Sequence, residues 1–293
     1  MAKTQTIRRR IRSVKNINQI TKAMEMVAAS KLRRAQENAL RSRMYSSSAR
    51  EALAYLRLLS KSRDHELFSH RPVTNRLFVV FTSDRGLAGA YNSNILKKLT
   101  ETLQRYQNNG GVKLIVIGNK GAQFTGRLRT TANIVGTYTN WPAEPSTADL
   151  QPIVRTAIKL YRQKSVDSVN IIYTDFVSTI KQEVVIREIL PINPAAILPN
   201  IKTSGATQPD TLFEPSPAAV LNFIVPRFIE TQIYQANLEA IASEQAMRMM
   251  SMKNASDNAH DIIDDLTLTF NGARQAAITQ ELAEISASAT AIV

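Results

Sequence analysis

Residues 20–36, ITKAMEMVAASKLRRAQ, decide how this chain is built. The stretch consists of helix-forming residues, and its apolar positions lie in a narrow stripe bordered by single charges. The pattern continues in both directions, since neither Gly nor Pro occurs from Lys3 to Leu59. At about 1.5 Å per residue, a helix over that range would be about 86 Å long. Such a helix extends beyond one compact domain, so we expect it to pack along a second long helix.

Apolar residues in this first segment recur at steps of three and four, which is the spacing of a coiled-coil seam rather than of a broad core-facing surface. The predicted seam comprises Ile7, Ile11, Val14, Ile17, Ile20, Met24, Val27, Ala28, Leu32, Ala35 and Ala39.

The far end of the chain repeats the pattern. No proline follows Pro226, and Gly272 is the only glycine in a stretch that could form about 100 Å of helix. Its predicted seam comprises Ala255, Ala259, Ile262, Leu266, Ile278, Leu282, Ile285, Ala289 and Ile292. We therefore predict that the two ends of the chain wind together as an antiparallel coiled coil.

The charge of the chain is divided between its ends. The formal net charge is +13, and residues 1–63 alone hold 16 Lys and Arg against three Glu. Residues 227–293 hold four basic and nine acidic groups. The two predicted helices are therefore electrostatic complements.

Between the ends, short apolar runs alternate with amphipathic stretches, which is typical of a small α/β domain with a parallel sheet. Strands are predicted at Arg76–Ser83, Lys113–Gly118 and Ser168–Asp175, helices at Ser93–Gln107 and Ala148–Gln163, and Val184–Leu190 could be a strand added at an edge. The predicted domains are a discontinuous coiled-coil shaft formed by residues 1–75 and 210–293 and a globular domain over 76–209, with a connecting segment at 191–209.

The residues give little support for catalysis. The loop SDRGLAG at 83–89 follows a predicted strand and could bind a small molecule, but it has neither a GxGxxG nor a Walker A spacing, so a structural turn is favoured. There are no cysteines, and His65, His70 and His260 lack a metal-ligand spacing. No Ser/His/Asp set can be assembled. We predict a chain that is not an enzyme and that binds neither cofactor nor metal.

Four motifs together carry a resemblance to a known family. They are IRRRIRSV at 7–14 with the quoted stretch at 20–36, SDRGL at 83–87, SEQAMRMMSMKNASDNA at 243–259, and ARQAAITQEL at 273–282. In this order they resemble the F-type ATP synthase gamma subunit along the whole chain. The sequence departs from the family at Ala88 and Ala90, where Cys-Gly is usual, at Gly272, often a basic residue, and at Ser288, often glycine.

The resemblance implies a Rossmann-like globular domain and a central rotor shaft that stands, one copy per complex, in a ring of three alpha and three beta subunits. It implies epsilon and the membrane c-ring as further partners, with torque coupling proton flow to ATP synthesis or hydrolysis in the beta subunits. Residues facing the stator would be Met24, Arg33, Arg34, Arg248, Arg274, Gln275, Thr279 and Glu281. For Asp84 and Arg85, a fold-stabilising ion pair and an epsilon contact both remain open.

Two other classes of function compete with this one. A strongly basic helix could bind nucleic acid, although only Tyr45 and Tyr55 supply aromatic rings in residues 1–63, and we expect no nucleic-acid partner. A nucleotide-using enzyme in residues 76–190 would depend on Asp84 or Lys120.

The compartment follows from the same pattern. No apolar run approaches the roughly 20 residues that cross a bilayer. Because the first motif begins at Ile7, we expect no cleaved targeting peptide and a bacterial origin. The expected location is peripheral, on the cytoplasmic side of the inner membrane, where partners hold the chain.

Overall fold

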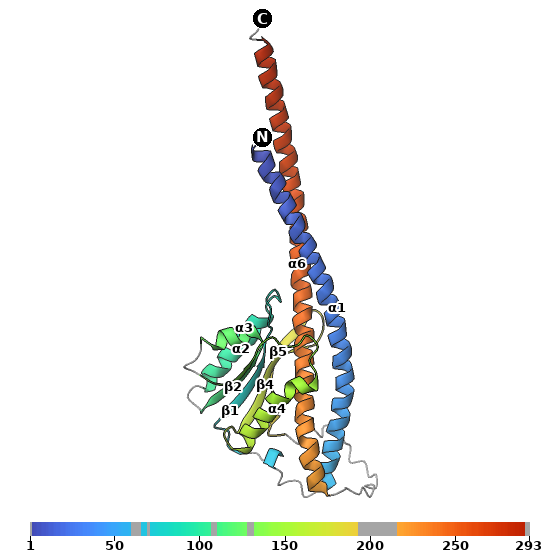
Figure 1. The fold of residues 1–293 in the computed structure, drawn as a ribbon, viewed down its shortest axis with the longest axis vertical. Helices are drawn as coiled ribbons and strands as arrows, with labels where there is room; N and C mark the ends of the chain where they lie inside the picture. Colours follow the sequence, from blue (N-terminus) through green and yellow to red (C-terminus); the bar gives the residue numbers. More distant parts are fainter. Residues whose placement is uncertain are drawn as a thin grey trace. The chain divides into compact units, whose positions relative to one another are not determined.

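A computed structural model describes residues 2–59, 66–68, 71–106, 110–127, 132–192 and 216–290. The chain divides into two compact units, one formed by Met1–Ser30 with Arg248–Val293 and the other by Lys31–Met247. Two long helices contribute to both units: α1 (Ala2–Leu59) and α6 (Pro217–Thr290). Both helices are labelled in Figure 1.

The second unit contains a five-stranded sheet in the order β3-β2-β1-β4-β5. Its strands are β1 (Arg76–Phe81), β2 (Val112–Ile117), β3 (Asn133–Tyr138), β4 (Ser168–Phe176) and β5 (Gln182–Leu190). Its remaining helices are η2 (Glu66–Phe68), α2 (Tyr91–Tyr106), α3 (Asn119–Thr125) and α4 (Thr147–Arg162). The first four strands pair in parallel, and β5 joins β4 in antiparallel orientation. The predicted α/β fold with an added edge strand is confirmed.

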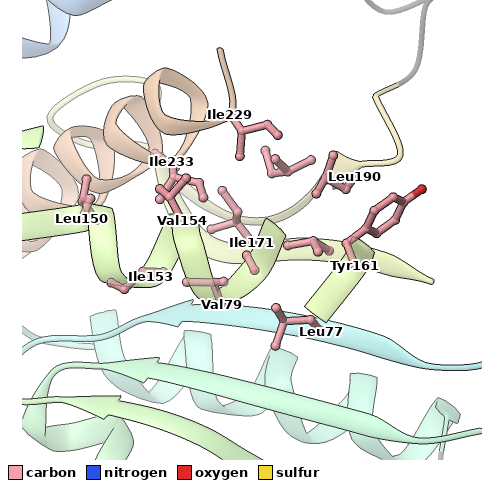
Figure 2. Packing of buried hydrophobic residues seen from close by; sticks show 14 of the residues in the cluster. Leu77, Val79, Leu150, Ile153, Val154, Tyr161, Ile171, Leu190, Ile229 and Ile233 are labelled. Atoms are coloured by element: carbon pink, nitrogen blue, oxygen red, sulfur yellow. The ribbon is translucent and has the colours of Figure 1, made fainter. Parts of the chain in front are cut away.

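Side chains alternate between the two faces of the sheet, and both faces are covered. On one face Leu77 and Val79 are fully buried, in a cluster that includes residues of α4 and α6. Figure 2 shows Ile229 and Ile233 of α6 in this cluster. On the other face the alternate residues of β1 pack with α2. Because every β1 side chain after Arg76 is buried, the strand is continuously apolar. The C-terminal helix is therefore part of the core of the second unit.

Within the second unit, α1 and α6 run antiparallel. Gln232 of α6 donates to the hydroxyl of Ser46 at 3.1 Å, and Arg43 donates to Glu239 at 3.3 Å, so residue numbers fall along one helix as they rise along the other. Most of the described α1 residues that are buried there are small, namely Ala35, Ala39, Ser42 and Ser46, and Leu32 is the large exception. Small side chains allow close approach of the two helices.

Within the first unit, the same two helices pair again. The hydroxyl of Ser256 on α6 donates to the side-chain oxygen of Asn18 on α1 at 2.6 Å. Buried or half-buried positions of α6 follow steps of four and three through Met252, Ser256, Ala259, Ile263, Leu266, Phe270, Ala273 and Ala277. That is a heptad seam, and the predicted antiparallel coiled coil of the two ends is confirmed.

Part of the predicted seam was wrong by one residue. Ile17, Ile20 and Val27 are 50–59% exposed, and half-buried Asn18 and Thr21 take seam positions instead. On α6 the seam uses Ile263 rather than Ile262, and Ile278, Leu282 and Ile285 are exposed. The prediction followed apolar residues alone, whereas this seam includes polar pairs. The side chain of Ala289 and all of Ile292 lie outside the described residues.

Several element boundaries also differ from the prediction. Helix α6 begins at Pro217 and includes Pro226, so this proline does not mark its start. One element, strand β3, was not predicted. Strand β3 carries a glycine and is half exposed at an edge, so it lacks the apolar run that reveals a buried strand. Residues 193–209 of the predicted connection and 210–215 of the predicted shaft lie outside the described residues.

Candidate interaction surfaces

Asp84 lies in the loop after β1, at the edge of the sheet where the parallel strands end. Its carboxylate accepts backbone N–H groups from Asn119 at 2.9 Å, Asn140 at 3.0 Å and Trp141 at 2.5 Å. These donors belong to the segments that follow β2 and β3. One carboxylate therefore joins the ends of three neighbouring strands.

The rest of this loop is arranged around a tight turn. The hydroxyl of Ser83 donates to the backbone carbonyl of Arg85 at 2.6 Å, and Asn92 of α2 bonds both the hydroxyl and the N–H of Ser83. Leu87 has a positive φ of 63°, and the side chain of Arg85 is exposed. Asp84 therefore stabilises the fold, because its carboxylate binds the backbone of two other loops. A partner contact stays a prediction for Arg85.

Two of the predicted stator-facing arginines lie on α1 in the second unit. Arg33 pairs with Glu37 one turn later, and Arg34 reaches Glu144 at 3.3 Å. All four side chains are more than half exposed, and such pairs contribute only about 0–1 kcal/mol. Both guanidinium groups can therefore exchange these partners for others at little cost.

The other predicted stator-facing residues lie in the first unit. Met24 and Arg248 are half buried, whereas Arg274, Gln275, Thr279 and Glu281 are exposed on α6. The hydroxyl of Thr279 donates to the carbonyl of Gln275 at 2.9 Å, one turn earlier. The structure brings the last four residues together on consecutive turns of one helix.

Exposed apolar side chains lie along the same part of α6. Ile278 is 49%, Leu282 60% and Ile285 64% exposed, and Leu268 reaches 72%. Within the first unit, α6 continues past the beginning of α1 (Figure 1), so α1 does not cover Ile278, Leu282 or Ile285, whereas Leu268 points away from the seam. A row of apolar groups of this kind indicates a surface for contact with another protein. Leu268 was not predicted as a surface residue. It could have been found in the sequence as an apolar residue that lies off the heptad seam.

Within the described ranges, no cluster of His, Asp or Glu side chains is arranged to hold a metal ion. None of the helices described is both long enough and apolar enough to cross a membrane.

Comparison with known proteins gives these surfaces a context. A family model described as "ATP synthase" matches residues 3–292. The ATP synthase gamma chain of Staphylococcus carnosus is 40% identical over 294 residues, and the match covers 100% of both chains. That of Herpetosiphon aurantiacus is 42% identical over 301 residues, covering 100% of this chain and 99% of the relative. This chain belongs to the ATP synthase gamma family.

Solved structures agree with the gamma family fold. The Tetrahymena thermophila mitochondrial ATP synthase, central stalk and c-ring, contains a chain 27% identical to this one with a TM-score of 0.59, covering 81% of this chain and 99% of that chain. A chain in the Euglena gracilis mitochondrial enzyme, OSCP/F1/c-ring, has 20% identity and a TM-score of 0.67, covering 99% and 95%. The second likeness concerns the fold alone. A gamma chain is a non-catalytic subunit of the ATPase complex.

Proposed function

We propose that this chain is the central rotor shaft of a proton-translocating F-type ATP synthase and has no catalytic residues of its own. It transmits torque between the membrane c-ring and the catalytic beta subunits of the alpha3beta3 ring. The observation that carries the proposal is the antiparallel pairing of the two chain ends, seen at Asn18 and Ser256, in a chain whose full length aligns with gamma chains.

The shaft acts through differential contacts. Two helices that differ in sequence present different side chains in every direction, so each of three beta subunits meets a different surface at one moment. A beta subunit then favours the conformation that contacts its surface best, and rotation exchanges the three surfaces in turn. Coupling needs no reactive group on the shaft.

Weak, replaceable contacts suit a rotating surface. Arg33, Arg34 and Arg248, with Met24, meet acidic segments of beta, and the two exposed arginines give attraction without tight binding. Arg274, Gln275, Thr279 and Glu281 hydrogen-bond to beta loops near the tip, where exposed apolar residues also meet the stator. Arg85 contacts epsilon. Alpha, beta, epsilon and c-ring subunits hold the chain peripherally on the cytoplasmic side of the bacterial inner membrane.

Reconstitution tests this function. Proteoliposomes that contain the complete complex with this chain should synthesise ATP when a proton gradient is applied, and the same preparation assembled without it should not. ATP synthesis driven by the gradient in the absence of the chain would refute the proposal. Cosedimentation of the chain with bacterial membranes, and its release with the alpha and beta subunits, tests the location.

The stator-facing arginines have their own test. Because exposed charge contacts are individually weak, we expect Arg33→Ala or Arg34→Ala alone to leave at least about half of the coupled ATP synthesis rate, and the double variant to lose more. Lys97→Ala, an exposed cation on α2, is the control. A complete loss in either single variant would show that the contacts are specific rather than replaceable.

A further inference from the structure

The loop between β3 and α4 is held in place at several points. In its first half, Asp84 accepts the backbone N–H groups of Asn140 at 3.0 Å and Trp141 at 2.5 Å. The indole N–H of Trp141 donates to the side-chain oxygen of Asn237 on α6 at 3.2 Å. This half of the loop is therefore tied both to the end of β1 and to the C-terminal helix.

The second half of the loop is restrained as well. Ser146 is the N-cap of α4, and its N–H and hydroxyl donate to Asp149 at 2.8 Å and 2.7 Å. Pro142 and Pro145 each have a φ that their ring restricts, and Pro145 is buried. Because few backbone conformations remain open to the loop, its residues keep their places at little further cost in entropy.

Glu144 lies between the two prolines and contacts α1. Its carboxylate accepts from the guanidinium of Arg34 at 3.3 Å, although the two residues are 110 positions apart in the sequence. The side chain of Arg34 is 68% exposed and that of Glu144 65%, so both can be reached from outside the chain. The loop thus contacts α6 through Trp141 and α1 through Glu144.

This ion pair differs in origin from its neighbour on α1. Arg33 pairs with Glu37 one turn later, and such a pair forms wherever these residues are helical. Arg34 and Glu144 meet only because the fold brings a restrained loop to the helix. The fold therefore supplies an acid to one of the arginines for which a stator contact is proposed.

We propose that Glu144 is the resting partner of Arg34, and that an acidic side chain of the beta subunit displaces it when the stator meets the shaft. This inference rests on the function proposed above. An acid of beta and Glu144 compete for the same guanidinium. Arg34 would hold both acids at once only with the two carboxylates close together, where their like charges repel.

The exchange is easy in both directions. An exposed ion pair of this kind shifts an equilibrium by no more than about fivefold, so neither acid holds Arg34 tightly. Because the backbone around Glu144 is already in place, only two side chains must be ordered to restore the internal pair. Arg34 then returns to Glu144 when the beta subunit moves away, and its charge is not left to bind the stator permanently.

Cross-linking tests which acid is in contact with position 34. The variant Arg34→Lys carries an amine there, and a water-soluble carbodiimide joins an amine to a carboxylate that it contacts. Mass spectrometry of the digested protein then identifies the joined residues. In the free full-length chain, position 34 should link mainly to Glu144. In the complex assembled with alpha and beta subunits, the yield of that link should fall by about fivefold, and a link to an acid of beta should appear.

Two further substitutions are made in the same Arg34→Lys chain. Glu144→Gln removes the internal acid, so the link from position 34 to beta should increase in the assembled complex. Glu183→Gln is the matched control, because Glu183 is also an exposed acid in an ion pair, with Lys181 at 2.8 Å. It should leave both links unchanged.

Copurification with the alpha and beta subunits separates two kinds of failure. A chain that does not copurify would contradict the proposed function and this inference together. A chain that copurifies while the Glu144 link keeps its free-chain yield would overturn this inference alone. Loss of that link without a link to beta would do the same, as would a free chain in which position 34 links to Glu37 rather than to Glu144.

Discussion

The Asp84 carboxylate accepts three backbone N–H groups that come from two other loops. Asp84→Ala leaves those donors to water or unsatisfied, and charge-assisted bonds of this kind are worth more than neutral ones. We expect a loss of about 2–4 kcal/mol in the free energy of unfolding, measured by urea titration. Asp84→Asn retains one acceptor oxygen and should lose less. A cost for the alanine below about 0.5 kcal/mol would contradict this role.

Asp167 makes the stability of the chain depend on pH. Burial raises the pKa of Asp167, but the N–H groups of Asn75 and Thr74 and the guanidinium of Arg71 outweigh burial and lower it overall. Arg71 bonds the carboxylate at 2.8 Å. The stabilisation is present above the ordinary carboxyl pKa and is lost as pH falls through the lowered one.

We therefore expect Asp167→Asn to destabilise the chain at neutral pH and to matter progressively less in acid. Urea unfolding at a series of pH values checks this. Glu66→Gln is the matched control, because Glu66 pairs with Arg162 at 3.8 Å and is largely exposed. A deficit that stayed constant down to the most acidic pH would show that Asp167 acts by packing instead.

At the scale of the element, Gly272 is a weak point in α6. A Cβ added there would meet nothing within 4 Å, so Gly272→Ala should stabilise the helix by about 1 kcal/mol. Hydrogen exchange of the surrounding amides should slow accordingly. Gly118→Ala is the contrasting variant, since Gly118 has φ +93° and its Cβ would lie 2.2 Å from the Thr82 carbonyl. Faster exchange around residue 272 in the alanine variant would contradict the expectation.

Periodicity predicted the long elements well because both helices run for many turns without interruption. It predicted the seam residues less well. One reason is that polar Asn18 and Ser256 pair inside the seam, and another is that Ile262 and Ile263 are equally apolar. Only the partner helix decides which of two adjacent isoleucines is covered. Strand β3 was missed because an edge strand with one exposed face carries a weak signal.

The sequence pointed to some candidate residues, but it did not reveal which groups they contact. The motif around Asp84 was visible in the sequence, but its three donors come from segments 35 to 57 positions away, which no local pattern reveals. The contact of α6 with the end of β4, where Ser243 donates to the Thr174 carbonyl at 3.0 Å, joins residues 69 positions apart. Tertiary contacts of this kind follow from the fold rather than from spacing.

At the scale of the whole molecule, the two ends of the chain depend on each other. The α1 residues 2–30 and the α6 residues from 248 onward form one unit, although residues 31–247 separate them in the sequence. Neither helix has another covering for its seam within that unit. A chain shortened at one end should therefore lose helix at the other.

The most direct measurement links Asn18 to Ser256 covalently in the working complex. The chain has no cysteine, so Asn18→Cys with Ser256→Cys introduces a single possible intrachain disulfide at a contact of 2.6 Å. If the two ends form one shaft that turns as a unit, oxidation should close the disulfide almost completely, and proton-driven ATP synthesis should equal that of the reduced complex. Failure of the disulfide to form, or loss of synthesis on oxidation that reduction restores, would contradict the account.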